Sequence, residues 1–186
     1  MEIVAHSLWA AAAAITANRT STPRISIGWS VWWTAFPDVL AFGPLVAIGL
    51  WLPYLVDGTS APEVGHVLPR MGIRLPLYPA GHSLIVFLLV FGVTTIMTRR
   101  IVYSMLGWLL HIVIDVPTHS FSYYATPFLW PISDFRIDGI PWRTPWFWVV
   151  TYVALGLVYG VMWKRGWLTR SAAAATVAGE GARRPI

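Results

Sequence analysis

Cysteine is absent from the 186 residues of this chain, and charged residues make up only 11% of it. The absence of cysteine excludes disulfide bonds and thiolate metal ligands. The scarcity of charge, beside 56% hydrophobic residues and a mean hydropathy of +0.62, excludes an ordinary soluble domain. We therefore expect an integral membrane protein, with most of its 12 Trp residues in interfacial belts and packing.

Hydrophobic residues form six blocks that predict an all-α fold, a polytopic membrane helical bundle. The blocks are Ile3–Ala17, Ile25–Phe36, Val39–Val56, Gly81–Thr98, Ile101–Asp115 and Trp146–Trp163. Gly43, Pro44 and Pro53 interrupt the third block, so we interpret it as a re-entrant or interfacial hairpin beside about five transmembrane helices. Residues 1–170 form one helical domain in this interpretation, and 171–186 form a disordered cytoplasmic tail.

The connection 116–145 has too many prolines for a helix and too many aromatic residues for a free loop, which predicts an ordered cap at the membrane interface. Basic residues then orient the chain. If all six blocks cross the membrane, Lys and Arg divide 6 against 7 between the two sides. With the hairpin they divide 9 against 4, and the larger group marks a cytoplasmic C-terminus: Arg19, Arg24, Arg99, Arg100, Lys164, Arg165, Arg170, Arg183 and Arg184.

Five ionisable residues reach one level of the five-span arrangement, near the non-cytoplasmic surface: His6, Asp38, His82, His111 and Asp115. A bilayer tolerates such residues only where they face one another, a cavity or an ion. His111 and Asp115 are four residues apart and so share one helix face. We expect that helix to end near Asp115, before Pro117, so that His119 turns back over the site. Imidazoles and carboxylates suit Zn²⁺, with Mn²⁺ or Fe as alternatives, while a hydrogen-bonded polar pair packing two helices is the competing interpretation.

A family resemblance rests on His6 and four short sequences: FPD at 36–38, GHS at 81–83, H-x3-D-x2-T at 111–118 and FLWPISDFR at 128–136. Together they resemble the membrane-bound metal-dependent hydrolases that are described as LexA-binding and inner-membrane-associated. The ligand order is also similar to that of zinc-dependent phospholipase C and the P1-type nucleases. The resemblance covers most of residues 1–165 and implies an inner-membrane protein. In the five-span arrangement its active site faces the non-cytoplasmic side.

The resemblance also implies hydrolysis by a metal-activated water at one or more Zn²⁺ ions, with Asp38 or Asp115 orienting the nucleophile. Arg136 is the candidate phosphate clamp, because a guanidinium matches phosphate geometry. Ser83 and Thr118 are candidate hydrogen-bond partners of the ligands. A site one helical turn below the surface favours a phosphoester of a membrane lipid as substrate, without direct contact to nucleic acid.

Two positions depart from the family pattern. Leu40 stands where relatives often carry an acid, and Leu77-Tyr78 stands where they often carry His-Arg. The number of metal ions is therefore open, and the candidate replacement ligands are Glu63, His66 and His119. Two other functions compete with the enzyme. A structural or regulatory membrane module would need no metal, and an ion or proton transporter would distribute its ionisable residues across the depth of the bilayer.

Overall fold

The computed structural model describes residues 2–20, 24–57 and 77–168, with the backbone alone over 45–57. Its elements follow in the order α1 (Ile3–Thr20), α2 (Ile27–Asp57), α4 (Tyr78–Gly81), α5 (Leu84–Thr98), the 3-10 helix η1 (Tyr103–Met105), α6 (Leu106–Thr118) and α7 (Pro145–Lys164). Within these ranges no β-strand occurs, and only isolated bridges form at Ser120. The predicted all-α class is therefore confirmed.

Several predicted features concern parts of the chain that the structure does not describe. The predicted tail over 171–186 lies outside the described residues, and so does the domain boundary at 170. The candidate replacement ligands Glu63 and His66 also lie outside them. The tail, the domain boundary and these two ligands therefore stay predictions.

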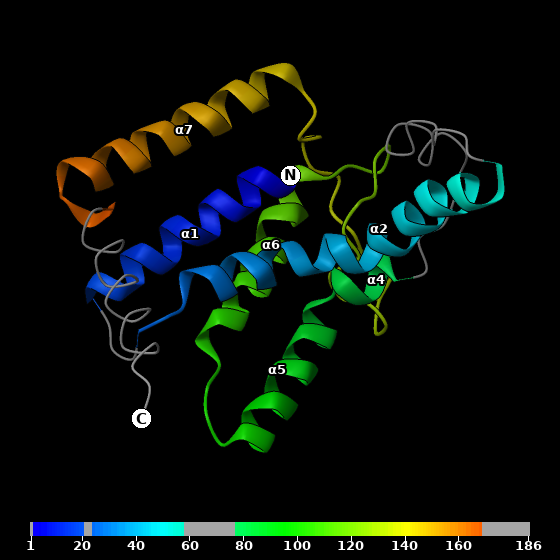
Figure 1. Ribbon diagram of the computed structural model, residues 1–186, viewed down its shortest axis with the longest axis horizontal. Helices are drawn as coiled ribbons and strands as arrows, with labels where there is room; N and C mark the ends of the chain where they lie inside the picture. The colour runs from blue at the N-terminus through cyan, green and yellow to red at the C-terminus, as the bar shows by residue number, and fades with distance from the viewer. Residues whose placement is uncertain (1, 21–23, 58–76, 169–186) are drawn as a thin grey trace.

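The long helix α2 lies at the centre of the bundle. It contacts α1, α4, η1 and α6, while α7 runs alongside α1 and α5 packs against α6 (Figure 1). A buried apolar cluster joins Phe87 of α5 to Trp108 and Ile112 of α6. The N-terminal end of α1 and the C-terminal end of α6 meet near the label N in Figure 1. The helix ends that carry most of the candidate ligands are thereby brought to one place.

The predicted hairpin over Val39–Val56 is wrong, because Ile27–Asp57 is one continuous helix of 31 residues. A proline inside a helix costs about 3 kcal/mol, since its ring crowds the preceding turn and its nitrogen donates no hydrogen bond. Pro37, Pro44 and Pro53 nevertheless lie within α2. A helix still satisfies nearly all the other backbone groups of an apolar segment. Packing also holds the first proline in place, because a Cβ on Gly81 of α4 would lie only 3.2 Å from its Cα.

Helix α6 extends about one turn beyond its predicted end. It continues past Asp115 to Thr118 with Pro117 inside it, and His119 follows in an extended conformation (φ −117°, ψ 151°). Proline removes one amide donor from the last turn, but the His119 amide still donates to the Asp115 carbonyl at 3.1 Å. The predicted return of His119 toward the site does occur, since its Nδ1 lies 3.4 Å from Asp115 Oδ1.

The connection between α6 and α7 is held by hydrogen bonds to the ends of two helices. The Leu84 amide of α5 donates to the Phe128 carbonyl at 2.9 Å, and the Gly139 amide donates to the His119 carbonyl at 2.8 Å. These bonds confirm that the segment is ordered, as its sequence predicts. Its location at a membrane interface stays a prediction.

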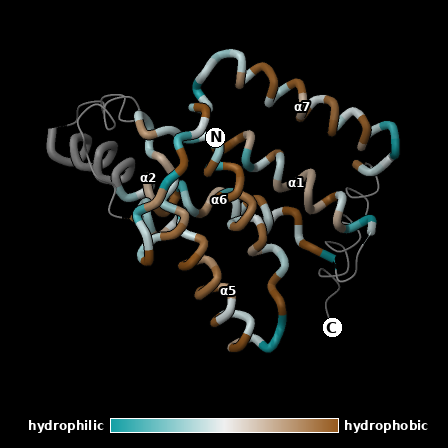
Figure 2. The backbone as a smooth tube through the Cα atoms, turned by 180° about the vertical axis from the view of Figure 1, so that it is seen from behind, coloured by the Kyte–Doolittle hydropathy of each residue, from teal (hydrophilic) through white to brown (hydrophobic). Residues whose placement is uncertain are grey.

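Among the described residues, α7 alone has both the length and the composition to cross a membrane, and few of its side chains are buried. Helix α5 is also apolar, but its 15 residues extend only about 22 Å at ~1.5 Å per residue. Figure 2 shows hydrophobic residues along both helices. The polytopic bundle with about five crossings therefore stays a prediction.

Gly107 lets α6 lie against α2. A Cβ at this position would lie 2.2 Å from the Ser30 carbonyl oxygen and 2.7 Å from Thr34 Oγ1. Both distances are too short for any side chain larger than hydrogen, and the first contact is to backbone that cannot rotate away. Because α6 also carries His111 and Asp115, this close approach sets the position of two candidate ligands relative to α2.

We expect Gly107→Ala to lower the free energy of unfolding by about 1–3 kcal/mol or more, because the added methyl group overpacks the contact between α2 and α6. Thermal unfolding of the detergent-purified protein measures the loss. Gly92→Ala in α5 is the matched control, since a Cβ there meets no atom within 4 Å. Equal melting temperatures for the two variants would contradict the close contact.

Candidate metal centre

Six side chains that the sequence predicts as metal ligands come together at one end of the bundle. They are His6 of α1, Asp38 of α2, His82 between α4 and α5, His111 and Asp115 of α6, and His119 directly after α6. All except Asp38 are buried. The convergence expected from the five-span arrangement is therefore present, while the role of these residues as ligands stays a prediction.

Local structure fixes the position of the ligand residues. Ser83 is the N-cap of α5, where its hydroxyl accepts hydrogen bonds of 3.1 and 3.2 Å from two amides of the first turn. This cap holds His82 at the helix start. Thr118 Oγ1 donates to the Ile114 carbonyl at 2.9 Å, within its own helix. In these bonds the two hydroxyls predicted to support the ligands act on the backbone.

The carboxylate of Asp115 lies at the centre of the cluster and faces four imidazoles. Its Oδ1 is 3.0 Å from His6 Nε2 and 3.4 Å from His119 Nδ1. Its Oδ2 is 3.1 Å from His111 Nε2 and 3.5 Å from His82 Nε2. Each oxygen therefore serves a different pair of histidines, an arrangement that suits a bridging ligand.

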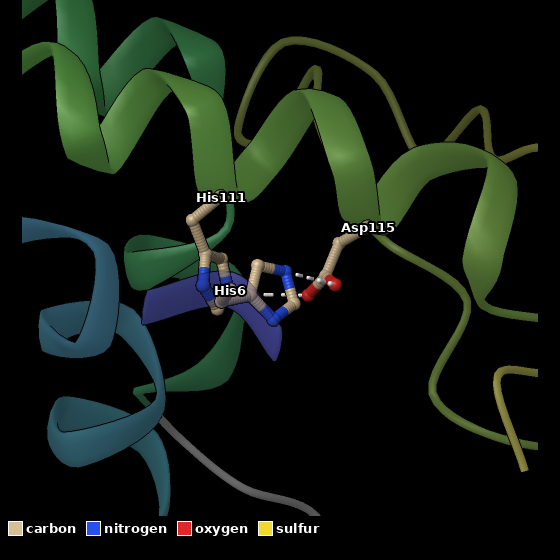
Figure 3. Close-up of side chains that lie close together, drawn as sticks. All are labelled: His6, His111 and Asp115. Atoms are coloured by element: carbon tan, nitrogen blue, oxygen red, sulfur yellow. Dashed lines mark ion pairs between the residues drawn. The ribbon is translucent and has the colours of Figure 1, made fainter. Parts of the chain in front are cut away.

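The ligand atoms form two triads that share His111, and within each triad they lie within 4.8 Å of one another. The enclosed triad contains His6, His111 and Asp115, whose side chains point toward one another (Figure 3). The open triad contains Asp38, His82 and His111. In the open triad the two Nε2 atoms are 3.1 Å apart, and Asp38 Oδ1 lies 3.6 and 3.8 Å from them.

Backbone carbonyls determine which nitrogen of two histidines faces the cluster. His6 Nδ1 lies 3.1 Å from the Glu2 carbonyl oxygen, and His82 Nδ1 lies 2.9 Å from the Tyr78 carbonyl oxygen. A carbonyl only accepts hydrogen bonds, so in the neutral rings each Nδ1 carries the proton and each Nε2 presents a lone pair. Metal-binding histidines are usually oriented in this way.

The lone pair of His6 has no hydrogen-bond donor among the described residues. His6 Nε2 is buried and makes no hydrogen bond to any described residue, although Asp115 Oδ1 lies 3.0 Å away. An unprotonated nitrogen and a carboxylate oxygen repel one another at this distance unless a proton or a cation lies between them. The Nε2 atoms of His82 and His111 face each other at 3.1 Å, and either a proton on His111 or a cation between the two nitrogens satisfies the His82 lone pair.

The spacing of the ligand atoms fits a zinc-sized ion. Bonds of ~2.0–2.1 Å at tetrahedral angles place neighbouring ligand atoms about 3.3 Å apart. The open triad has distances of 3.1, 3.6 and 3.8 Å, so a small inward movement brings all three atoms into that geometry. Three nitrogen and oxygen ligands with a fourth position free are typical of catalytic rather than structural zinc sites.

A cavity of about 430 Å³ adjoins the open triad. Asp38 and His119 both line it, and the Asp38 side chain is 20% exposed whereas that of Asp115 is 1% exposed. Aromatic side chains form much of the remaining wall, namely those of Phe42, Tyr78, Tyr123, Tyr124 and Trp142. Asp38 is therefore the carboxylate that reaches both the cluster and the cavity, and Asp115 is enclosed behind it.

His119 belongs to neither triad. Its Nδ1 lies 3.2 Å from the Asp115 backbone oxygen, so its other ring nitrogen is left for a group in the cavity. Burial lowers the pKa of the His119 imidazole from 6.5 to about 4, so the ring is neutral at neutral pH. This position suits a residue that contacts a substrate better than one that binds the ion directly.

The predicted phosphate clamp Arg136 is exposed and lines neither the cavity nor a triad. Arg143 does not line the cavity either, but its guanidinium packs against a residue that does. Its Cζ lies 5.0 Å from the ring centroid of Tyr123, a cavity residue, and its neighbour Trp142 also lines the cavity. Burial raises the pKa of Tyr123, and Arg143 opposes that rise. Nothing in the sequence distinguishes Arg143 from the other basic residues, so only the fold reveals it.

Tyr78 is a second residue whose role the sequence does not reveal. Its ring stacks on that of His82 with centroids 4.0 Å apart, and its hydroxyl donates to the Tyr124 carbonyl at 2.6 Å. Its own carbonyl accepts the hydrogen bond that orients His82. In the sequence it is visible only as a departure from the family pattern, although it holds a candidate ligand from two sides.

A comparison of the chain with protein-family models, with curated proteins and with solved structures finds no match. No family is therefore assigned, and the resemblance to membrane-bound hydrolases stays a prediction. The chemistry of the site is accordingly inferred from its own residues.

We expect gently purified wild-type protein to contain stoichiometric zinc or a similar ion, and His111→Ala to lose it, because His111 belongs to both triads. Elemental analysis of the two proteins measures the difference. His119→Ala is the matched control and should keep most of its metal, since its ring lies outside both triads. Equal losses would place His119 among the ligands, and a metal-free wild type would contradict the metal centre.

Proposed function

We propose that this chain is a membrane-embedded, metal-dependent hydrolase that cleaves a phosphoester of a lipid with an activated water molecule. The observation that carries the proposal is the open triad of Asp38, His82 and His111 beside the cavity. Its atoms match the spacing of zinc ligands, and one of them meets the space where a substrate would bind. A site of this kind is suited to hydrolysis rather than to holding the fold together.

A membrane location is supported by the outer surfaces of α5 and α7. Leu89 of α5 is 66% exposed and Leu157 of α7 is 67% exposed, and similar apolar side chains surround them. Soluble proteins rarely expose apolar surface on this scale. The aromatic residues Tyr123, Tyr124 and Trp142 lie at the cavity, as expected for the level of lipid headgroups. The proposed location is the inner membrane, with the site on the non-cytoplasmic side.

The two carboxylates, Asp115 and Asp38, have different roles in the proposed chemistry. A bound Zn²⁺ ion would supply a water that ionises near neutral pH and positive charge for the phosphoryl oxygens. Asp115 lies within 3.5 Å of nitrogens of four histidines and would offset the positive charge of an ion held among them. Asp38 contributes one oxygen to the open triad, and its second oxygen accepts a hydrogen bond from the attacking water in the cavity. His119, which also lines the cavity, contacts the substrate there.

The arrangement of charge weighs against a transporter. A proton or ion pathway requires ionisable side chains at successive depths of the bilayer. In the described part of the chain, the buried ionisable side chains instead gather in one cluster around Asp115. A purely structural module is disfavoured by the open cavity, which an interhelical polar contact does not require.

We expect the zinc-loaded protein to release phosphate-containing product from a phospholipid in mixed micelles, and Asp38→Asn to reduce kcat by more than about 100-fold. The amide keeps the shape of the side chain but cannot accept the proton of water. Asp134→Asn, at an exposed carboxylate in the connection after α6, is the control and should retain full activity. An Asp38→Asn protein as active as this control would refute the proposed role of Asp38.

A second prediction separates the two candidate phosphate-binding arginines. Arg143→Ala should raise KM for an anionic phosphoester about tenfold, because it removes a charged donor beside the cavity. Arg136→Ala should change KM less, since Arg143 is the arginine whose guanidinium packs on the ring of a cavity residue. Steady-state kinetics of both variants at one ionic strength provides the measurement. A larger rise in KM for Arg136→Ala than for Arg143→Ala would support Arg136 as the phosphate-binding arginine, as the sequence predicts.

A further inference from the structure

An apolar groove of about 710 Å³ lies between α1, α6 and α7. Its lining is almost wholly hydrocarbon, with Trp9 and Ala13 from α1, Val113 from α6, and Phe147, Ala154 and Met162 from α7 among its residues. The volume is in the range of about 300–1,000 Å³ that ligand sites usually have. Neither the metal centre nor the proposed chemistry accounts for this groove.

A small third hollow of about 10 Å³ lies between the groove and the catalytic cavity. This hollow shares Glu2 and Trp142 with the cavity, and it shares Phe147 and Thr151 with the groove. The three hollows therefore follow one another along the N-terminal ends of α1 and α7. One end of this row adjoins the candidate metal centre and includes the Asp38 carboxylate in its wall, and the other end is apolar.

We propose that the groove binds an acyl chain of the lipid whose phosphoester occupies the catalytic cavity. This inference rests on the proposed function and narrows its substrate class to lipids with long acyl chains. A molecule with a charged head and a hydrocarbon tail suits this row, because its head can reach the cavity beside the metal centre while its tail lies in the apolar groove.

The dimensions and chemistry of the groove favour an acyl chain over a segment of protein. Phe147 and Met162, both in the groove, are separated by about 22 Å along α7 at ~1.5 Å per residue, a length that suits a long extended chain. An extended peptide would leave backbone polar groups without partners against such walls. An acyl chain has no groups of that kind, and burying each CH₂ contributes about 0.8 kcal/mol.

The geometry of α7 provides a matched pair of variants. Ala154 lines the groove, whereas the adjacent Val153 is 56% exposed and does not line it. A Trp at position 154 would fill the groove, and a Trp at position 153 would extend outward from the same turn. Any general effect of a large aromatic residue on α7 is therefore common to both variants.

The first experiment measures binding without relying on activity. Full-length protein in phosphatidylcholine nanodiscs is photolabelled with a phosphatidic acid analogue that carries a diazirine near the end of one long acyl chain. We expect label on the groove residues of α1, α6 and α7, and about a tenfold loss of that label in Ala154→Trp but not in Val153→Trp. Label confined to the outer residues of α7, or equal labelling of the two variants, would overturn the proposal.

The second experiment separates this inference from the proposed function. Ala154→Trp should reduce kcat/KM for a long-chain phospholipid about tenfold and leave hydrolysis of a short-chain, water-soluble phosphoester unchanged, with Val153→Trp as the control. An equal loss on both substrates would overturn the role of the groove. If the wild-type protein hydrolyses neither substrate, the proposed function fails, and the photolabelling result still decides whether the groove holds an acyl chain.

Discussion

The structure depends on groups that offset the negative charge of one buried carboxylate, that of Asp115. Asp115 is 1% exposed, and nitrogens of four histidines lie 3.0 to 3.5 Å from its two oxygens. An ionised carboxylate in an apolar interior costs several kcal/mol unless it is paired. The histidines come from α1, from the residue between α4 and the N-cap of α5, from α6 and from the position directly after α6, so pairing the charge also joins these elements. Because His6 and His82 present lone pairs to the cluster, a cation or shared protons must complete the balance.

Close packing at small residues allows this compensation to occur. Gly107 brings α6 against the backbone of α2, and Gly81 brings α4 against Pro37 of α2. The indole Nε1 of Trp108 then donates to the Gly81 carbonyl at 2.6 Å, which joins α6 to α4 directly. His82 follows Gly81, so the same contacts that define the bundle also place a candidate ligand. The contacts that pack the helices together therefore also position the residues of the site.

The hollows beside the cluster differ in polarity, and this difference bears on the proposed function. Where the polar cluster ends, the aromatic cavity begins, and an apolar groove follows along α1 and α7. The two carboxylates are distinguished by their exposure, since Asp38 reaches the cavity and Asp115 does not. The imidazole of His119 occupies a third position, beside the cluster but facing the cavity. Two carboxylates of the same chemistry, Asp38 and Asp115, can thus have different roles because their exposure differs, and the role of His119 likewise follows from its position.

The sequence by itself determined the helical class and the identity of the cluster, because ionisable residues within apolar blocks have few stable positions other than facing one another. It also predicted that these residues reach one level. It could not determine that α2 continues through Pro37, because the packing of Gly81 that offsets the proline comes from 44 residues further along the chain. The exclusion of His119 from the triads, the position of Arg143 and the groove beside α7 were likewise decided only by the tertiary structure. Local patterns report the conformation and polarity of a segment, whereas these features arise from distances between segments that are remote in sequence.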